Sequence, residues 1–136
     1  EPHCVALRTD HPLADREHLE VDNLVGERLI LRPYCQKWTA CAAMLEANGV
    51  DIASNHEVAS DRDASRLLEA GLGIAVVPAS TRVSEKLRKI PIAPSFEKSI
   101  HLYAVAGRSR SQALIGLINL LRSADWSRFQ TTVAVS

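Results

Sequence analysis

Several residues that could bind an anion directly follow apolar segments that we expect to be strands. Arg32 follows the apolar run 29–31, and Ser60 and Arg62 follow the apolar-ended segment 56–59. A guanidinium holds a carboxylate with two parallel hydrogen bonds, and the backbone amides at a helix start, where Ser60 would stand, attract negative charge. These residue types and positions predict a site for a small anion, or for a molecule that carries a carboxylate.

Neighbouring residues at the same three strand ends complete the candidate site. The predicted ligand-binding residues are Arg32, Pro33, Tyr34, Cys35, Ser60, Asp61, Arg62 and Val77. Each type also has an ordinary structural interpretation. Ser60 is a good helix cap, Pro33 and Tyr34 are able simply to pack, and most surface arginines are solvated or paired with acids.

The sequence supports a catalytic site or a metal site less well than an anion site. Cys35 and His56 could lie at neighbouring strand ends as a nucleophile and its base, but no third residue orients them, and a buried or cleft-lining thiol is the commoner role. The five histidines lack metal-ligand spacing, and Cys35 and Cys41 form no C-x-x-C pair. Gly71-Leu72-Gly73 follows a predicted helix and precedes a strand, the reverse of a phosphate-binding loop. The sequence predicts no catalytic residue, metal or cofactor.

The segment 59–80 contains the clearest element signals. Ser60 can cap a helix while Asp63, three residues later, faces the same exposed amides. Helical spacing of apolar residues continues to Ala70, and Gly71 stands where a left-handed residue would end the helix. The uninterrupted apolar run 74–77 then predicts a strand covered on both faces.

Other elements follow from the same kind of pattern. Strands are expected at 4–7, 28–32, 56–59, 87–92 and 100–106, a short helical or turn segment at 21–27, and helices at 36–47 and 111–124. Apolar 29–31 favours a central strand, whereas Pro91 favours a sheet edge. The alternation of strands and helices predicts an α/β fold, three layers around a mostly parallel sheet, whose ligands bind at the carboxyl ends of strands.

Composition restricts the class of protein further. The 136 residues contain 16 basic and 16 acidic side chains, so no overall field would attract DNA or an anionic membrane. Three cysteines are an odd number, and no secretory h-region or membrane-spanning apolar run is visible. We expect a cytoplasmic, reduced protein that does not itself bind DNA or a membrane.

A family resemblance emerges from four segments taken together. These are His11-Pro12-Leu13-Ala14, Gly26-Glu27-Arg28-Leu29-Ile30, the segment 59–80, and Tyr103-Ala104-Val105 followed by an apolar helix. In their order and spacing they resemble the effector-binding domain of LysR-type transcriptional regulators over nearly the whole chain. The resemblance implies a periplasmic-binding-protein type II-like fold, a small-molecule effector in a cleft between two lobes, and no enzymatic activity.

The resemblance also implies a division of the chain. Residues 1–136 would be a partial effector-binding domain, with the second lobe and crossing strand at 1–106 and the C-terminal helix and tail at 107–136. The family's winged helix-turn-helix and most of its first lobe have no counterpart here, so DNA would be contacted only through that absent part. The 111–124 helix is apolar over more than one stripe, which predicts self-association to a dimer or a higher oligomer.

Two other functions remain open from the residues alone. One is a periplasmic-type solute-binding lobe, which would require export. The other is a small α/β enzyme, which would require a reactive Cys35 thiol. A regulator needs neither, because its activity is a coupling between ligand binding and subunit packing.

Overall fold

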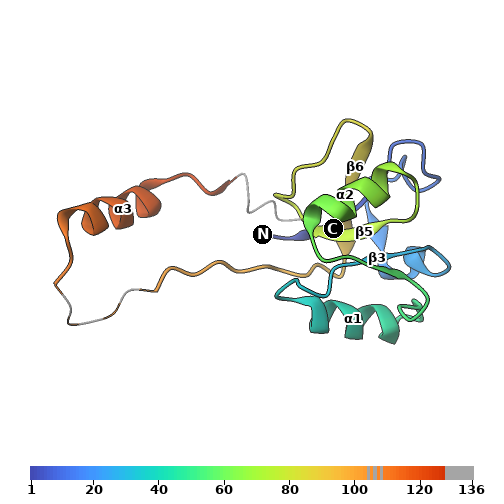
Figure 1. Cartoon of the computed structure of the whole chain (residues 1–136), viewed down its shortest axis with the longest axis horizontal. Helices are drawn as coiled ribbons and strands as arrows, with labels where there is room; N and C mark the ends of the chain where they lie inside the picture. The colour runs from blue at the N-terminus through green and yellow to red at the C-terminus, as the bar shows by residue number, and fades with distance from the viewer. Residues whose placement is uncertain (104, 106, 108, 128–136) are drawn as a thin grey trace.

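A layered α/β body and a separate C-terminal helix make up the chain (Figure 1). The structure is a computed structural model and describes residues 1–103, 105, 107 and 109–127. Its elements are β1 (His3–Arg8), β2 (Leu19–Glu20), the 3-10 helix η1 (Val21–Leu24), β3 (Ile30–Leu31), α1 (Trp38–Ala47), β4 (His56–Glu57), α2 (Asp61–Glu69), β5 (Ala75–Pro78), β6 (Leu87–Ala93) and α3 (Gln112–Ser123).

The strands form one four-stranded and one two-stranded sheet, linked by a bridge. The larger sheet has the order β2-β6-β1-β5, with β1 antiparallel to both neighbours and β2 parallel to β6. β3 and β4 pair in parallel, and a parallel bridge joins Leu29 to Ile74 just before β5. β3 therefore has partners on both sides, as its apolar sequence predicts. The expectation of a mostly parallel sheet is therefore wrong: the sheets are mixed, because β1 is antiparallel to both β5 and β6, while β2–β6 and β3–β4 are parallel.

Three layers result because alternate residues of a strand face opposite sides. On one side, Leu7 and Leu31 belong to the same core cluster as Leu45 of α1. On the other, Ala6 of β1 packs in a second cluster with Leu68 of α2. Figure 1 shows β5 and β3 between these two helices. The predicted three-layer α/β arrangement is therefore observed.

Helix α2 begins and ends where the sequence indicates. The Ser60 hydroxyl accepts a hydrogen bond from the Asp63 amide at 3.2 Å and so caps the first turn. At the other end Ala70 is the C-cap, and Gly71 has a φ of +73°, which a residue without a Cβ adopts without a clash. The Gly71 amide donates to the Leu68 carbonyl at 2.9 Å, closing the last turn.

Two further expectations about the body are corrected. α1 begins at Trp38, two residues later than expected, because the chain from Arg32 first makes two tight turns, in which the Cys35 amide donates to the Arg32 carbonyl and the Trp38 amide to the Cys35 carbonyl. β6 lies inside the sheet and not at its edge. β2 pairs only with Ile92 and Ala93, so the strand up to Pro91 keeps one open side, where a residue without an N–H is tolerated.

A strand is expected at 100–106. The structure describes this segment except for Ala104 and Ala106, and the described residues form no strand. Ile100 is 80% exposed and Tyr103 86% exposed, and no neighbouring strand pairs with them. An apolar sequence forms a strand only when another strand satisfies its backbone groups.

The C-terminal helix α3 agrees with its predicted bounds. The Ser111 hydroxyl accepts from the Leu114 amide at 3.3 Å and caps it. In Figure 1, α3 stands apart from the body. Most of its large apolar side chains are exposed: Leu114, Ile115, Leu117 and Leu120. Over the described residues, no helix combines the length and apolar character that crossing a membrane requires.

Candidate functional site

An open cavity of about 500 Å³ lies at the carboxyl ends of β3, β4 and β5. The loop after β3, the first residue of α2 and the end of β5 form its walls, together with His3 of β1 and Lys98. Its lining residues are His3, Arg32, Tyr34, Cys35, Gln36, Lys37, Asp61, Pro78, Ser80, Thr81 and Lys98. We call this the outer cavity.

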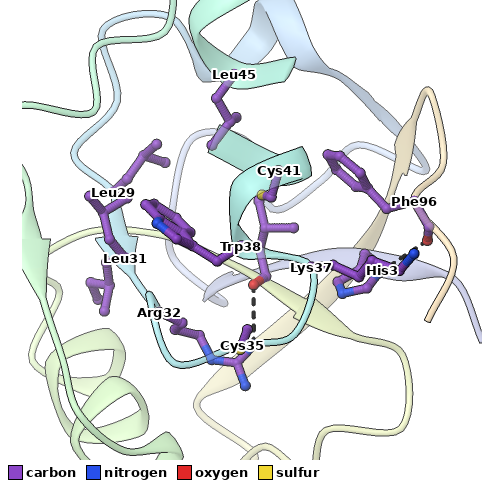
Figure 2. A pocket seen from close by; sticks show the side chains of 12 residues that line it. His3, Leu29, Leu31, Arg32, Cys35, Lys37, Trp38, Cys41, Leu45 and Phe96 are labelled. Atoms are coloured by element: carbon purple, nitrogen blue, oxygen red, sulfur yellow. Dashed lines mark hydrogen bonds between the residues drawn. The ribbon is translucent and has the colours of Figure 1, made fainter. Parts of the chain in front are cut away.

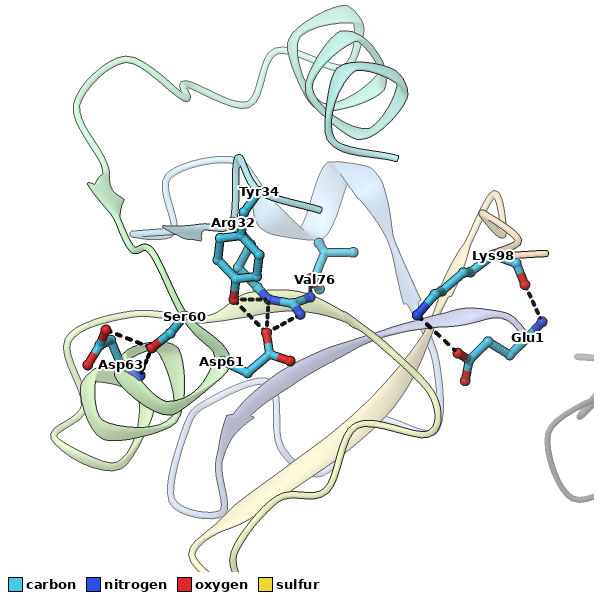
Figure 3. Close-up of polar contacts among 8 residues, drawn as sticks. All are labelled: Glu1, Arg32, Tyr34, Ser60, Asp61, Asp63, Val76 and Lys98. Atoms are coloured by element: carbon cyan, nitrogen blue, oxygen red, sulfur yellow. Dashed lines mark hydrogen bonds and ion pairs between the residues drawn. The ribbon is translucent and has the colours of Figure 1, made fainter. Parts of the chain in front are cut away.

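A buried guanidinium organises one wall of the outer cavity. The Arg32 side chain is 7% exposed, and its Nη2 and Nε donate to Oδ1 of Asp61 at 2.5 and 3.2 Å. The Tyr34 hydroxyl donates to the same oxygen at 2.5 Å, and Arg32 Nη1 donates to the Val76 carbonyl at 3.4 Å (Figure 3). Two loops 29 residues apart in sequence are thereby joined at the cavity.

These contacts fix the charge states of the cluster. Partial burial opposes ionisation of Asp61, but the hydrogen bonds from Tyr34 and Arg32 outweigh it and hold the pKa of Asp61 below its ordinary value. Burial and the bond to Asp61 raise the pKa of Tyr34 to about 12. At neutral pH the cluster is therefore an arginine cation, an aspartate anion and a neutral phenol.

Beneath the outer cavity lies a much smaller apolar one of about 30 Å³, which we call the inner cavity. Its apolar lining comes from β3, α1, β5 and the chain after β6: Leu29, Ile30, Leu31, Trp38, Cys41, Leu45, Val76 and Phe96. Four side chains line both cavities, so the two are neighbours: His3, Arg32, Cys35 and Lys37. Figure 2 shows them around the inner cavity. The inner cavity has room for about one or two waters and not for a ring.

The cysteine thiols at this site are poor nucleophiles. Burial raises the pKa of Cys35, and the nearby Arg32 charge only partly offsets it. Burial and the neighbouring Cys35 raise the pKa of Cys41 to about 11. Because the thiolate is the reactive form, both thiols are protonated and inert near neutral pH.

The outer cavity is basic although the chain as a whole is neutral. Among the described residues that line it are the cations Arg32, Lys37 and Lys98 and a single carboxylate, Asp61. Glu1 lies beside Lys98, with Oε1 3.9 Å from Nζ, and accepts from the Ser80 amide at 3.0 Å. Positive charge focused in a hollow attracts small anions.

Four of the residues predicted from the sequence meet in this cavity: Arg32, Tyr34, Cys35 and Asp61. The other four do not line it. Pro33 and Arg62 are exposed outside it. The Ser60 hydroxyl caps α2 and donates to Asp63 Oδ2 at 2.7 Å, and Val77 is 2% exposed within the core on the α2 side.

Side chains alternate along β5, so the residue next to Val77 faces the α1 side of the sheet. Val76, one position earlier, lines the inner cavity. Among the described residues, no group of three or more histidine, cysteine or acidic side chains is arranged to hold a metal ion.

Other cavity residues escaped sequence reasoning, chiefly His3, Lys37, Thr81 and Lys98. His3 pairs with Pro78 in the antiparallel β1–β5 ladder, which brings the start of one strand to the end of another. That register is invisible without the topology. Lys37 directly follows the loop at 32–36, so its place at the strand ends could have been predicted from the sequence. Nothing in the sequence around Lys98 indicates that it lines the cavity.

An α/β body with a basic hollow at its strand ends is typical of domains that bind small molecules. The family model for the LysR substrate binding domain matches residues 1–126, so the chain belongs to that family of regulatory, non-enzymatic domains. A comparison with curated proteins gives no match.

Several solved structures share the fold. The regulatory domain of CcmR from Synechocystis PCC6803, in complex with 2-PG, has a TM-score of 0.65 and 21% identity over 88% of this chain and 61% of that one. The BenM effector binding domain with its effector benzoate has a TM-score of 0.60 and 28% identity over 68% of this chain and 45% of that one. The reduced form of OxyR has a TM-score of 0.53 and 25% identity over 70% of this chain and 47% of that one.

These likenesses confirm the α/β, periplasmic-binding-protein type II-like fold of a LysR effector-binding domain. The chain spans between 45% and 61% of the length of these three relatives.

Proposed function

We propose that the outer cavity binds a small anionic effector and that this binding is the input of a LysR-type transcriptional regulator. The observation that carries the proposal is the buried Arg32 guanidinium at the wall of a cavity with two further cations, Lys37 and Lys98. A guanidinium and two ammonium groups favour a carboxylate or a similar anion. The related BenM domain is described with benzoate as its effector, which is an anion of this size class.

Binding would act by shifting populations and not by chemistry. A ligand favours whichever arrangement of lobes and subunits binds it better, and that coupling changes the spacing of DNA-binding domains. With 16 basic and 16 acidic residues, the chain offers no global attraction for DNA. We therefore assign DNA contact to a separate winged helix-turn-helix and place the regulator in the cytoplasm.

Calorimetric titration of the chain with benzoate and with 2-PG tests the proposal. Lys37→Gln and Lys98→Gln each remove one cation from an exposed or half-exposed position, and each should weaken binding about three- to tenfold. Arg32→Gln should weaken it further, because it removes the buried cation of the cavity wall.

Two variants serve as matched controls. Arg62→Gln removes an exposed arginine that does not line the cavity, and Ser60→Ala removes the α2 cap. Both should leave anion affinity unchanged, while Ser60→Ala lowers stability by about 1 kcal/mol. Equal loss of affinity in Arg62→Gln and Lys98→Gln would contradict the proposed site, and the absence of any anion binding would contradict the proposed function.

A further inference from the structure

His3 is the one neutral imidazole at the junction of the two cavities among the described lining residues. Its side chain is 9% exposed, and its ring meets Phe96 edge to face at 5.7 Å between centroids. Figure 2 shows the ring with one nitrogen toward the Phe96 carbonyl and the other turned away from it. A buried polar ring in such a position has to satisfy both nitrogens.

The hydrogen-bond pattern determines the tautomer. Nδ1 lies 3.1 Å from the Phe96 carbonyl oxygen, which only accepts, so Nδ1 carries the hydrogen and donates it. Burial lowers the pKa of His3, and the nearby Arg32 charge lowers it further, so the ring is neutral near pH 7. Nε2 is then an acceptor, and none of the described residues donates to it.

Nε2 of the neutral ring can only accept, whereas the cations of the cavity can only donate; Gln36, Ser80 and Thr81, which also line it, can do either. Arg32, Lys37 and Lys98 donate only, and Asp61 Oδ1 already accepts from Arg32 and Tyr34. A ligand that excludes water from the cavity without offering a donor would leave Nε2 buried and unpaired, which opposes binding. The cations repel an ammonium group, so the donor that suits this environment is an uncharged hydroxyl.

We propose that His3 is a specificity-determining residue and that the effector is a hydroxycarboxylate, whose hydroxyl donates to His3 Nε2 while its carboxylate lies among the cations. This inference rests on the proposed function of the outer cavity and specifies the class of ligand. A cavity built to accept a hydroxyl rejects the analogue that lacks it more strongly than an apolar pocket rejects a lost methylene.

Matched pairs of acids that differ only by a hydroxyl test the inference on the whole chain. The pairs are propionate with lactate and with 3-hydroxypropionate, and benzoate with its three monohydroxy isomers, which sample different spacings between the two groups. In the wild type, at least one hydroxy acid should bind more tightly than its parent acid, by a factor of about ten or more.

His3→Phe keeps a ring beside Phe96 but has no acceptor, so the preference for the hydroxy acid should fall to about one. The parent acid no longer leaves an acceptor unpaired, so it should bind this variant more tightly than it binds the wild type. His3→Gln retains an amide oxygen and should keep part of the preference. Denaturant unfolding of both variants shows whether the body remains folded, and His3→Gln provides the test if His3→Phe is unstable.

The outcomes separate the two proposals. If every hydroxy acid binds the wild type no better than its parent, while Arg32→Gln weakens both, the hydroxyl assignment is wrong and the anion site stands. A preference that persists unchanged in His3→Phe and His3→Gln also overturns the role of His3. If no acid of either kind binds, the proposed function fails and this inference fails with it.

Discussion

One carboxylate oxygen of Asp61 links two loops of the candidate site. Its Oδ1 accepts from both Arg32 and Tyr34, while the side chain stays 63% exposed. Arg32 is buried and always charged, so it needs a nearby anion. In the absence of ligand Asp61 supplies that charge from within the chain.

The pH dependence of stability should report this contact. The pKa of Asp61 is lowered in the folded chain, so its ionised form stabilises the fold above the unfolded pKa of about 4, and this contribution is lost as pH falls through the folded value. We predict that Asp61→Asn is less stable than the wild type at pH 6 to 8 and that the gap closes toward pH 3. Urea unfolding at a series of pH values measures it.

Tyr34→Phe is the companion variant, because it removes one of the donors to Asp61 and leaves the arginine. Its stability should differ less from that of the wild type, and the difference should vary with pH in the same way. A stability difference between the wild type and Asp61→Asn that stays constant from pH 8 to pH 3 would mean that the ion pair does not stabilise the folded chain.

At the scale of elements, Gly73 allows β5 to approach β3. A Cβ added there would lie 2.4 Å from the Arg28 carbonyl oxygen, which accepts the Ile74 amide at 2.8 Å. The same bridge aligns the strand ends that form the outer cavity. The close approach therefore belongs to the fold and to the site at once.

Gly73→Ala should destabilise the chain by about 2 kcal/mol or more, because backbone has to move where the two strands meet. Gly116→Ala is the matched control, since a Cβ at that position of α3 meets nothing within 4 Å and alanine favours a helix. Denaturant unfolding compares the two. Equal stability of Gly73→Ala and the wild type would show that the close approach of the two strands does not require a glycine.

Elements with local signals were predictable from the sequence, and those that depend on partners were not. The cap at Ser60 and the left-handed Gly71 specify α2 through their own backbone neighbours. Pro91 was assigned to an edge because the sequence does not reveal that β2 is only two residues long. The segment 100–106 has strand-forming residues, but the described ones find no strand to pair with.

The candidate site divides in the same way. Arg32, Tyr34 and Asp61 were predicted because they directly follow strands whose carboxyl ends meet. His3 reaches the cavity only through the antiparallel register of β1 with β5, and Lys98 only through the path of the chain after β6. Their sequence neighbourhoods contain nothing that indicates either placement.

At the scale of the whole molecule, the body and α3 differ in how they bury apolar surface. The body has a core cluster on each face of its sheet. On α3, Ile118 is buried, whereas Leu117 is 48% and Leu120 65% exposed. A helix of 12 residues is marginal in water on its own, so α3 depends on a packing partner for much of its stability.

We predict that the 136-residue chain self-associates through this face of α3, because a second copy offers the same apolar surface and a two-fold contact would cover both. Sedimentation equilibrium should show a dimer at high concentration. Replacing Leu117 and Leu120 together with lysine should weaken the association at least tenfold, since two charged side chains would have to be desolvated. Arg122→Gln, a polar change on the same helix, is the control and should leave the dimer intact.

A wild-type chain that stays monomeric at the highest concentration reached would contradict the prediction. Anion affinity at the outer cavity should be the same in the lysine variant, because neither leucine lines that cavity.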